Sequence, residues 1–109
     1  MGSNRAMPRI RRRLQVKFSG PGASGMGFTE NISATGMLLH SMAACKPGLT
    51  ISGTMTIPGT GEVPFEARVT WLRRITGPLA QFTKNSIGVT FTRAPDEAFY
   101  RLLTGPGAG

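Results

Sequence analysis

The sequence predicts a mainly β protein, a small antiparallel barrel or sandwich with one short helix near its C-terminus. Apolar and polar residues alternate over several short segments, as in strands that have one buried and one wetted face. Gly and Pro residues suited to turns separate these segments, and about six strands at this spacing are typical of a small barrel or sandwich. The 109 residues are enough for one domain with one modest core.

Each strand is predicted from its own alternation. The expected strands are residues 14–18, 37–39, 49–57, 65–71 and 87–91. The glycine-rich stretch between residues 20 and 27 is interpreted as a flexible hairpin. Trp71 has the same phase as Phe65 and Val69, so it is expected in the core.

A helix is expected after the last strand. Pro95 suits the first helical position, and the two acids that follow it would lie in the first turn, where the helix dipole favours them. Phe99, Leu102 and Leu103 fall at helical spacing, and we expect them to cover the open end of a barrel.

The domain is predicted to span residues 9–103. Residues 1–8 and 104–109 are expected to be flexible tails, because neither carries an apolar pattern that could pack against a core. Six of the thirteen Lys and Arg residues lie in the first eighteen positions, so the basic charge is concentrated near the N-terminus.

Composition restricts the kind of protein. Thirteen Lys and Arg against five Asp and Glu give a net charge of +8, which predicts an anionic partner such as nucleic acid, a nucleotide, an acidic protein or a membrane surface. Cys45 is the one cysteine, which excludes an internal disulfide and a cysteine-based zinc site. No apolar run approaches the roughly 20 residues of a membrane helix, and a cytoplasmic location is expected.

The sequence shows no arrangement typical of an enzyme. His40 and Cys45 lie close in sequence but lack a third group that would orient them. Glu62 and Glu66 would be roughly 13 Å apart along a strand, which does not suit paired acid–base chemistry. We therefore expect no catalytic residues, no metal site and no cofactor.

Two segments stand out from this background. Arg9-Ile10-Arg11-Arg12-Arg13 directly precedes the first predicted strand, and Asn31-Ile32-Ser33-Ala34-Thr35-Gly36 precedes the second. Taken singly, the first is a solvated basic tail and the second a turn whose side chains cap backbone groups. Taken together and in this order, they make the chain resemble a PilZ domain, a bacterial receptor module for cyclic di-GMP.

The resemblance rests on two motifs of that family. Arg9 and Arg13 match its Arg-x-x-x-Arg motif, while Asn31, Ser33 and Gly36 match its Asp/Asn-x-Ser-x-x-Gly motif. Segments at residues 67–72 and 86–91 also look like the family's late strands, so the resemblance covers roughly residues 8–103. It implies a six-stranded antiparallel β-barrel with a short C-terminal helix that binds cyclic di-GMP.

The chemistry of the ligand agrees with these residue types. Guanidinium groups bind phosphate oxygens and the O6/N7 edge of guanine, and their planar faces stack on purines. Arg9 and Arg13 are therefore expected to hold guanine and phosphate, with Arg11 and Arg12 as weaker candidates. Asn31 and Ser33 are expected to bond a guanine edge. Gly36 would give clearance to the ligand or to a tight backbone turn.

The arginine-rich segment also suggests how the signal is relayed. Without ligand, residues 1–12 are expected to be mobile, and binding should order them against the barrel near residues 31–36, changing the surface seen by a downstream protein partner. Two alternatives remain open: a small nucleic-acid-binding barrel, and a ligand-free adaptor that binds another protein. The first is disfavoured because Phe65, Trp71 and Phe91 share the apolar phase instead of being displayed for stacking.

Overall fold

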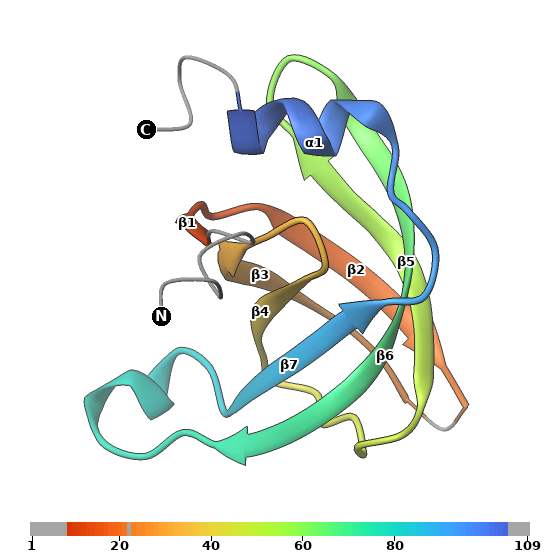
Figure 1. Cartoon of the computed structure of the whole chain (residues 1–109). Helices are drawn as coiled ribbons and strands as arrows, with labels where there is room; N and C mark the ends of the chain where they lie inside the picture. The colour runs from red at the N-terminus through yellow and green to blue at the C-terminus, as the bar shows by residue number, and fades with distance from the viewer. Residues whose placement is uncertain (1–8, 22, 105–109) are drawn as a thin grey trace, which may run out of the picture.

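The strands form one sheet that closes on itself. The computed structural model describes residues 9–21 and 23–104 (Figure 1). Its strands are β1 (Ile10–Arg11), β2 (Gln15–Gly20), β3 (Ala23–Ile32), β4 (Gly36–Ser41), β5 (Thr50–Ile57), β6 (Gly61–Arg74) and β7 (Asn85–Phe91). All pairings are antiparallel, in the order β1-β3-β2-β5-β6-β7-β4, and a further β3–β4 pairing closes the barrel. The predicted antiparallel barrel of six strands is confirmed, with β1 as an additional short strand.

The interior is filled by the residues that the alternation placed on one face. The fully buried apolar side chains include Val16 on β2, Ile51 and Met55 on β5, and Ile87 on β7. Their neighbours in sequence, such as Lys17, point outward and are exposed. Removing this apolar surface from water, at about 25 cal/mol per Å², is the main term that stabilises the barrel.

The glycine-rich stretch is a hairpin, as interpreted, but most of it is paired strand: Gly20 ends β2 and lies opposite Ala23 of β3. β3 begins at Ala23 and pairs with β2 over its first half and with β4 over its second half. Gly27 lies where the backbone of β4 comes closest: a Cβ there would be 2.1 Å from the carbonyl oxygen of His40. The alternation was hidden in the sequence because such positions admit no side chain.

Trp71 lies outside the core, contrary to expectation. The register of β6 against β7 shifts between Val69 and Trp71, so Thr70 is an extra residue that reverses the direction of the following side chains. Trp71 is 38% exposed and its indole packs over Gly88, where a Cβ would lie 2.3 Å from the ring. The side chain of Leu72 packs against the core instead.

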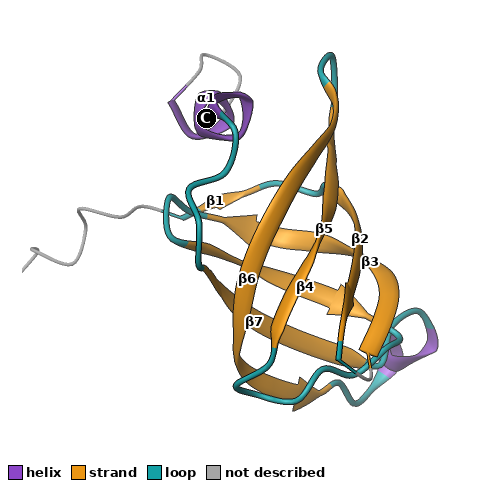
Figure 2. Cartoon of the chain, turned by 90° about the vertical axis from the view of Figure 1, so that its right-hand side faces the viewer, coloured by secondary structure: helices purple, strands orange, loops and turns teal. Residues whose placement is uncertain are grey.

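The C-terminal helix α1 (Glu97–Thr104) lies at one end of the barrel (Figure 2). Asp96 is its N-cap: its side-chain Oδ1 accepts the backbone N–H of Ala98 at 2.9 Å. Pro95 therefore precedes the cap instead of occupying the first helical position. Phe99 is fully buried and packs edge-on against Phe91, while Leu102 and Leu103 pack against the core, as predicted.

A 3-10 helix, η2 (Pro78–Gln81), lies between β6 and β7. Thr104, expected in the C-terminal tail of residues 104–109, is the last residue of α1. The remainder of that tail and the expected tail at residues 1–8 lie outside the described residues. Among the residues that the structure describes, no helix is long and apolar enough to cross a membrane.

Candidate functional site

The two sequence motifs meet through backbone pairing. β1 runs antiparallel to the end of β3, with Ile10 opposite Ile32 and Arg11 opposite Asn31. Ile10 packs against the core, so β1 is attached to the barrel by side-chain packing as well as by backbone pairing. The expected mobility of residues 1–12 in the absence of ligand stays a prediction, and residues 1–8 lie outside the described part of the chain.

A buried threonine holds this segment in place. The hydroxyl of Thr29 accepts the backbone N–H of Leu14 at 2.8 Å and donates to the carbonyl of Arg12 at 2.5 Å. The backbone N–H of Arg12 in turn donates to the carbonyl of Glu30 at 3.2 Å. The role of Thr29 could not be predicted from the sequence, because a threonine on a strand is ordinarily a surface residue.

Arg9 and Asn31 make a direct side-chain contact between the two motifs. The Nη1 group of Arg9 donates to Oδ1 of Asn31 at 2.6 Å, joining residues 22 positions apart in the chain. Both side chains remain accessible to solvent. Their donors and acceptors are thus gathered at one point on the surface.

Arg13 lies on an aromatic platform nearby. Its guanidinium carbon is 3.9 Å from the centroid of the Phe28 ring. That ring stacks on the imidazole of His40, with centroids 5.7 Å apart and planes 9° from parallel. Planar groups from β3, β4 and the arginine segment are therefore layered on the outer wall of the barrel.

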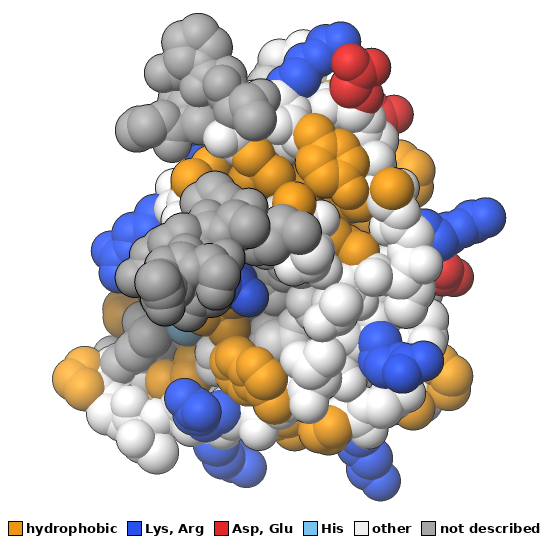
Figure 3. Space-filling model, in the orientation of Figure 1, with side chains coloured by type: hydrophobic (Ala, Val, Ile, Leu, Met, Phe, Trp, Pro, Cys, Tyr) orange, Lys and Arg blue, Asp and Glu red, His pale blue; other side chains and the backbone are white. Residues whose placement is uncertain are grey.

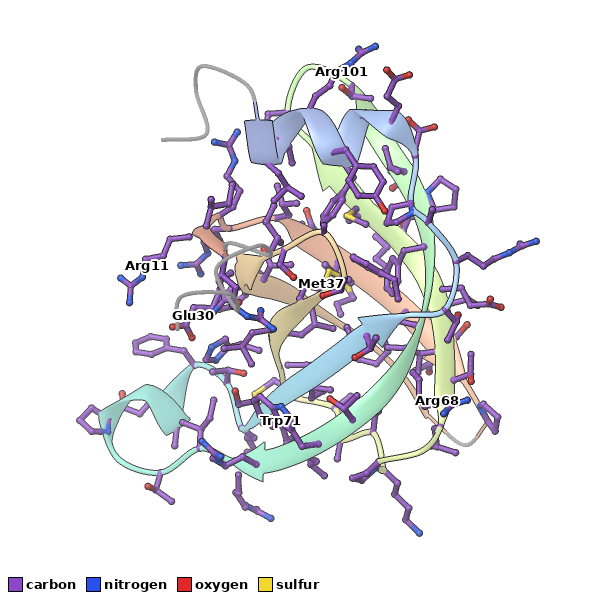
Figure 4. The ribbon with its side chains drawn as sticks, in the orientation of Figure 1. Arg11, Glu30, Met37, Arg68, Trp71 and Arg101 are labelled. Carbon is purple, nitrogen blue, oxygen red and sulfur yellow. The ribbon has the colours of Figure 1, made fainter. Side chains whose placement is uncertain are left out.

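These groups line a pocket of about 600 Å³. The side chains around it are Arg11, Arg12, Arg13, Phe28, Thr29, Glu30, His40 and Phe82. Figure 4 shows Arg11 and Glu30 on the same side of the barrel, where β1 meets β3. Figure 3 shows Lys and Arg side chains beside hydrophobic ones on this left-hand side of the molecule. The pocket is suited to a planar, anionic ligand, since it offers both stacking faces and cationic donors.

Ser33 and Gly36 have structural roles in the turn between β3 and β4. The hydroxyl of Ser33 is buried; it accepts the N–H of Thr35 and donates to the carbonyl of Gly36, both at 3.3 Å. A Cβ on Gly36 would lie 2.1 Å from the carbonyl oxygen of Val89 on β7. The clearance that Gly36 gives is therefore to the barrel's own backbone, and the turn it shapes fixes the position of Asn31.

The single cysteine is poorly suited to nucleophilic chemistry. Burial raises the pKa of the Cys45 thiol above its usual range, which disfavours the thiolate that nucleophilic chemistry needs. Within residues 9–21 and 23–104, no three His, Cys, Asp or Glu side chains are grouped to hold a metal ion.

Sequence reasoning missed three residues of the site and one repeated spacing. The residues are Phe28, Glu30 and His40, which lie on neighbouring strands and are brought together by the β3–β4 register. Arg5, outside the described residues, stands four positions before Arg9, so the Arg-x-x-x-Arg spacing occurs twice, at 5–9 and at 9–13. This second occurrence of the Arg-x-x-x-Arg spacing can be found in the sequence without the structure.

The fold and the site define a small closed antiparallel barrel with a cationic, aromatic-lined pocket on its wall. Among known families, the PilZ domain family matches residues 3–104. The chain therefore belongs to the PilZ domain family, a family of cyclic di-GMP receptor and adaptor domains.

A solved structure shares the fold. "Structure of Bacillus subtilis Inhibitor of motility (MotI/DgrA)" superposes with a TM-score of 0.69 at 18% sequence identity, covering 94% of this chain and 48% of that one. The present chain thus spans about half the length of that protein. No curated protein matches the chain by sequence.

Proposed function

We propose that this domain is a receptor that binds cyclic di-GMP at the junction of β1 and β3 and relays the level of this second messenger to a downstream protein. The observation that carries the proposal is the contact between Arg9 and Asn31, one residue from each family motif. The adjoining pocket of about 600 Å³, with Arg11, Arg12 and Arg13 around it, supports the same location.

The role proposed for each residue follows from how accessible its side chain is to a ligand. Arg9 and Arg13 take guanine or phosphate through charged hydrogen bonds or stacking, and Asn31 bonds a guanine edge. Arg11 and Arg12 add positive charge for the phosphates. Ser33 is buried, so its part is to hold the turn and not to touch the base.

The relay is proposed to act through the arginine segment. The strand β1 is two residues long, and such a short pairing opens easily. A ligand that bridges Arg9 or Arg13 to the barrel would hold it closed and so change the surface shown to a partner.

This relay predicts slower amide exchange in the segment on binding. The N–H of Arg12, which donates to Glu30, should exchange at least several-fold more slowly with cyclic di-GMP than without it. Hydrogen–deuterium exchange of residues 9–13 measures this, with the helix α1 as an internal reference. Equal exchange of the segment in the free and the saturated protein would rule out the relay while leaving binding itself intact.

Selectivity between bases provides the direct test of the proposed function. Adenine replaces the O6 acceptor of guanine by an amino donor and lacks the N2 amino group, so cyclic di-AMP should bind at least about 10-fold more weakly than cyclic di-GMP. Isothermal titration calorimetry with both ligands gives the ratio. Equal affinities would contradict recognition of guanine.

Two alternative functions give different results in the same experiment. Tight binding of single-stranded DNA with a steep salt dependence, together with no heat from cyclic di-GMP, would identify a nucleic-acid-binding barrel. An absence of binding to either ligand would leave an adaptor that acts only through protein contacts.

A further inference from the structure

Glu30 is an acidic residue in a pocket whose other charged groups are mostly arginines. A carboxylate there repels the phosphates of an anionic ligand, so its presence in the pocket has to be explained by some other contact. Its side chain is 41% exposed, which leaves it accessible to a ligand in the pocket. Neither family motif includes this position.

The carboxylate is held in a fixed orientation. Nε2 of His40 lies 2.5 Å from Oε1 of Glu30, and the His40 side chain is only 9% exposed. The imidazole is itself fixed by stacking on Phe28. The second oxygen of the carboxylate takes no part in the contact with His40, and Oε1 keeps a further lone pair.

A carboxylate held in this way matches one particular base edge. The Watson–Crick edge of guanine presents two adjacent donors, N1–H and the N2 amino group, to which two carboxylate oxygens are complementary. Adenine presents an acceptor at N1 and would leave the carboxylate opposed by a lone pair. The aromatic rings of Phe28 and Phe82 line the same pocket and offer faces on which a base can stack.

We infer that Glu30, positioned by His40, reads the Watson–Crick edge of one guanine of the ligand. This inference rests on the proposed function, because it assigns a specificity-determining residue within the same site. Glu30 would contact the base directly, whereas His40 is a positioning residue that acts through the carboxylate. Asn31, which lies beside Arg9, would then contact a different part of the ligand.

The test compares Glu30→Gln with the unaltered protein, using cyclic di-GMP and its inosine analogue, cyclic di-IMP, which lacks only the two N2 amino groups. The unaltered protein should prefer cyclic di-GMP by at least about 10-fold, the effect of one hydrogen bond to a charged group. Glu30→Gln should weaken cyclic di-GMP binding by at least about 10-fold and reduce that preference to about 3-fold or less. Glu62→Gln, an equal change of charge outside the pocket, is the matched control and should leave both affinities within about 2-fold.

The possible results separate this inference from the proposed function. If the unaltered protein does not bind cyclic di-GMP, the proposed function fails. A different result overturns the inference alone. If the unaltered protein binds cyclic di-GMP, and Glu30→Gln binds both ligands at least as tightly as the unaltered protein does and with the same preference between them, Glu30 serves only to offset the arginine charges. Circular dichroism and a thermal melt of Glu30→Gln establish that the comparison is between folded proteins.

Discussion

Replacing Arg9 and Arg13 together by alanine is expected to weaken cyclic di-GMP binding by at least about 100-fold. Each hydrogen bond to a charged group contributes roughly 1.5–3 kcal/mol, so two such contacts contribute about 3 kcal/mol or more. Arg9 lies against Asn31 and Arg13 against Phe28, so the two guanidinium groups occupy different positions and one cannot replace the other. Calorimetric titration of the double variant measures the loss.

The stability of the domain should change little in the same variant. Both side chains lie on the surface, where removing such contacts usually changes the free energy of unfolding by less than about 1 kcal/mol. The double variant Arg68→Ala/Arg101→Ala removes the same charge from sites remote from β1, as the labels in Figure 4 show. If this control loses affinity as strongly as the arginine variant, binding depends on net charge and not on the motif.

Gly36→Ala is expected to destabilise the fold by about 3 kcal/mol or more, and to lower the melting temperature by about 10 °C or more. The added Cβ would meet the backbone carbonyl of Val89 at 2.1 Å, and a backbone atom within the β4–β7 pairing cannot move aside without disrupting that pairing. Chemical denaturation monitored by circular dichroism gives the free energy of unfolding.

A neighbouring variant separates this effect from a general sensitivity of the turn. Thr35 is exposed in the same turn, so Thr35→Ala should change the free energy of unfolding by less than about 0.5 kcal/mol. If Gly36→Ala melts like the unaltered protein but no longer binds cyclic di-GMP, the glycine makes room for the ligand and its role in strand packing is refuted.

The strands were predictable wherever alternation was complete. β5 and the first half of β6 could be predicted from the sequence because one face of each is apolar and buried. The residues are Ile51, Met55 and Ile57 on β5, with Gly53 between them, and Val63, Phe65, Ala67 and Val69 on β6. β3 could not be predicted in this way, because the close approach of neighbouring backbone requires glycine at positions such as Gly27, and the glycines interrupt the alternation. Trp71 was misplaced because a one-residue bulge at Thr70 reverses the pattern, and a single sequence carries no mark of a bulge.

The site was predictable to the extent that it consists of local motifs. Arg9 and Asn31 were both identified from spacing, and the structure brings them into contact. The pair Glu30–His40 could not be predicted, because Glu30 lies at the irregularity in the β3–β4 pairing, between Thr29 and Asn31. The attachment of β1 was missed as well, since a two-residue strand anchored by Thr29 has no periodicity to detect.

Binding of cyclic di-GMP at the junction of β1 and β3 can be tested residue by residue. The isotopically labelled protein is titrated with cyclic di-GMP and followed by two-dimensional amide NMR. Binding at this junction should give saturable shifts concentrated in residues 9–13, at Glu30 and Asn31, and at His40, with α1 nearly unaffected. No shifts at saturating ligand, or shifts confined to the opposite wall of the barrel, would contradict it.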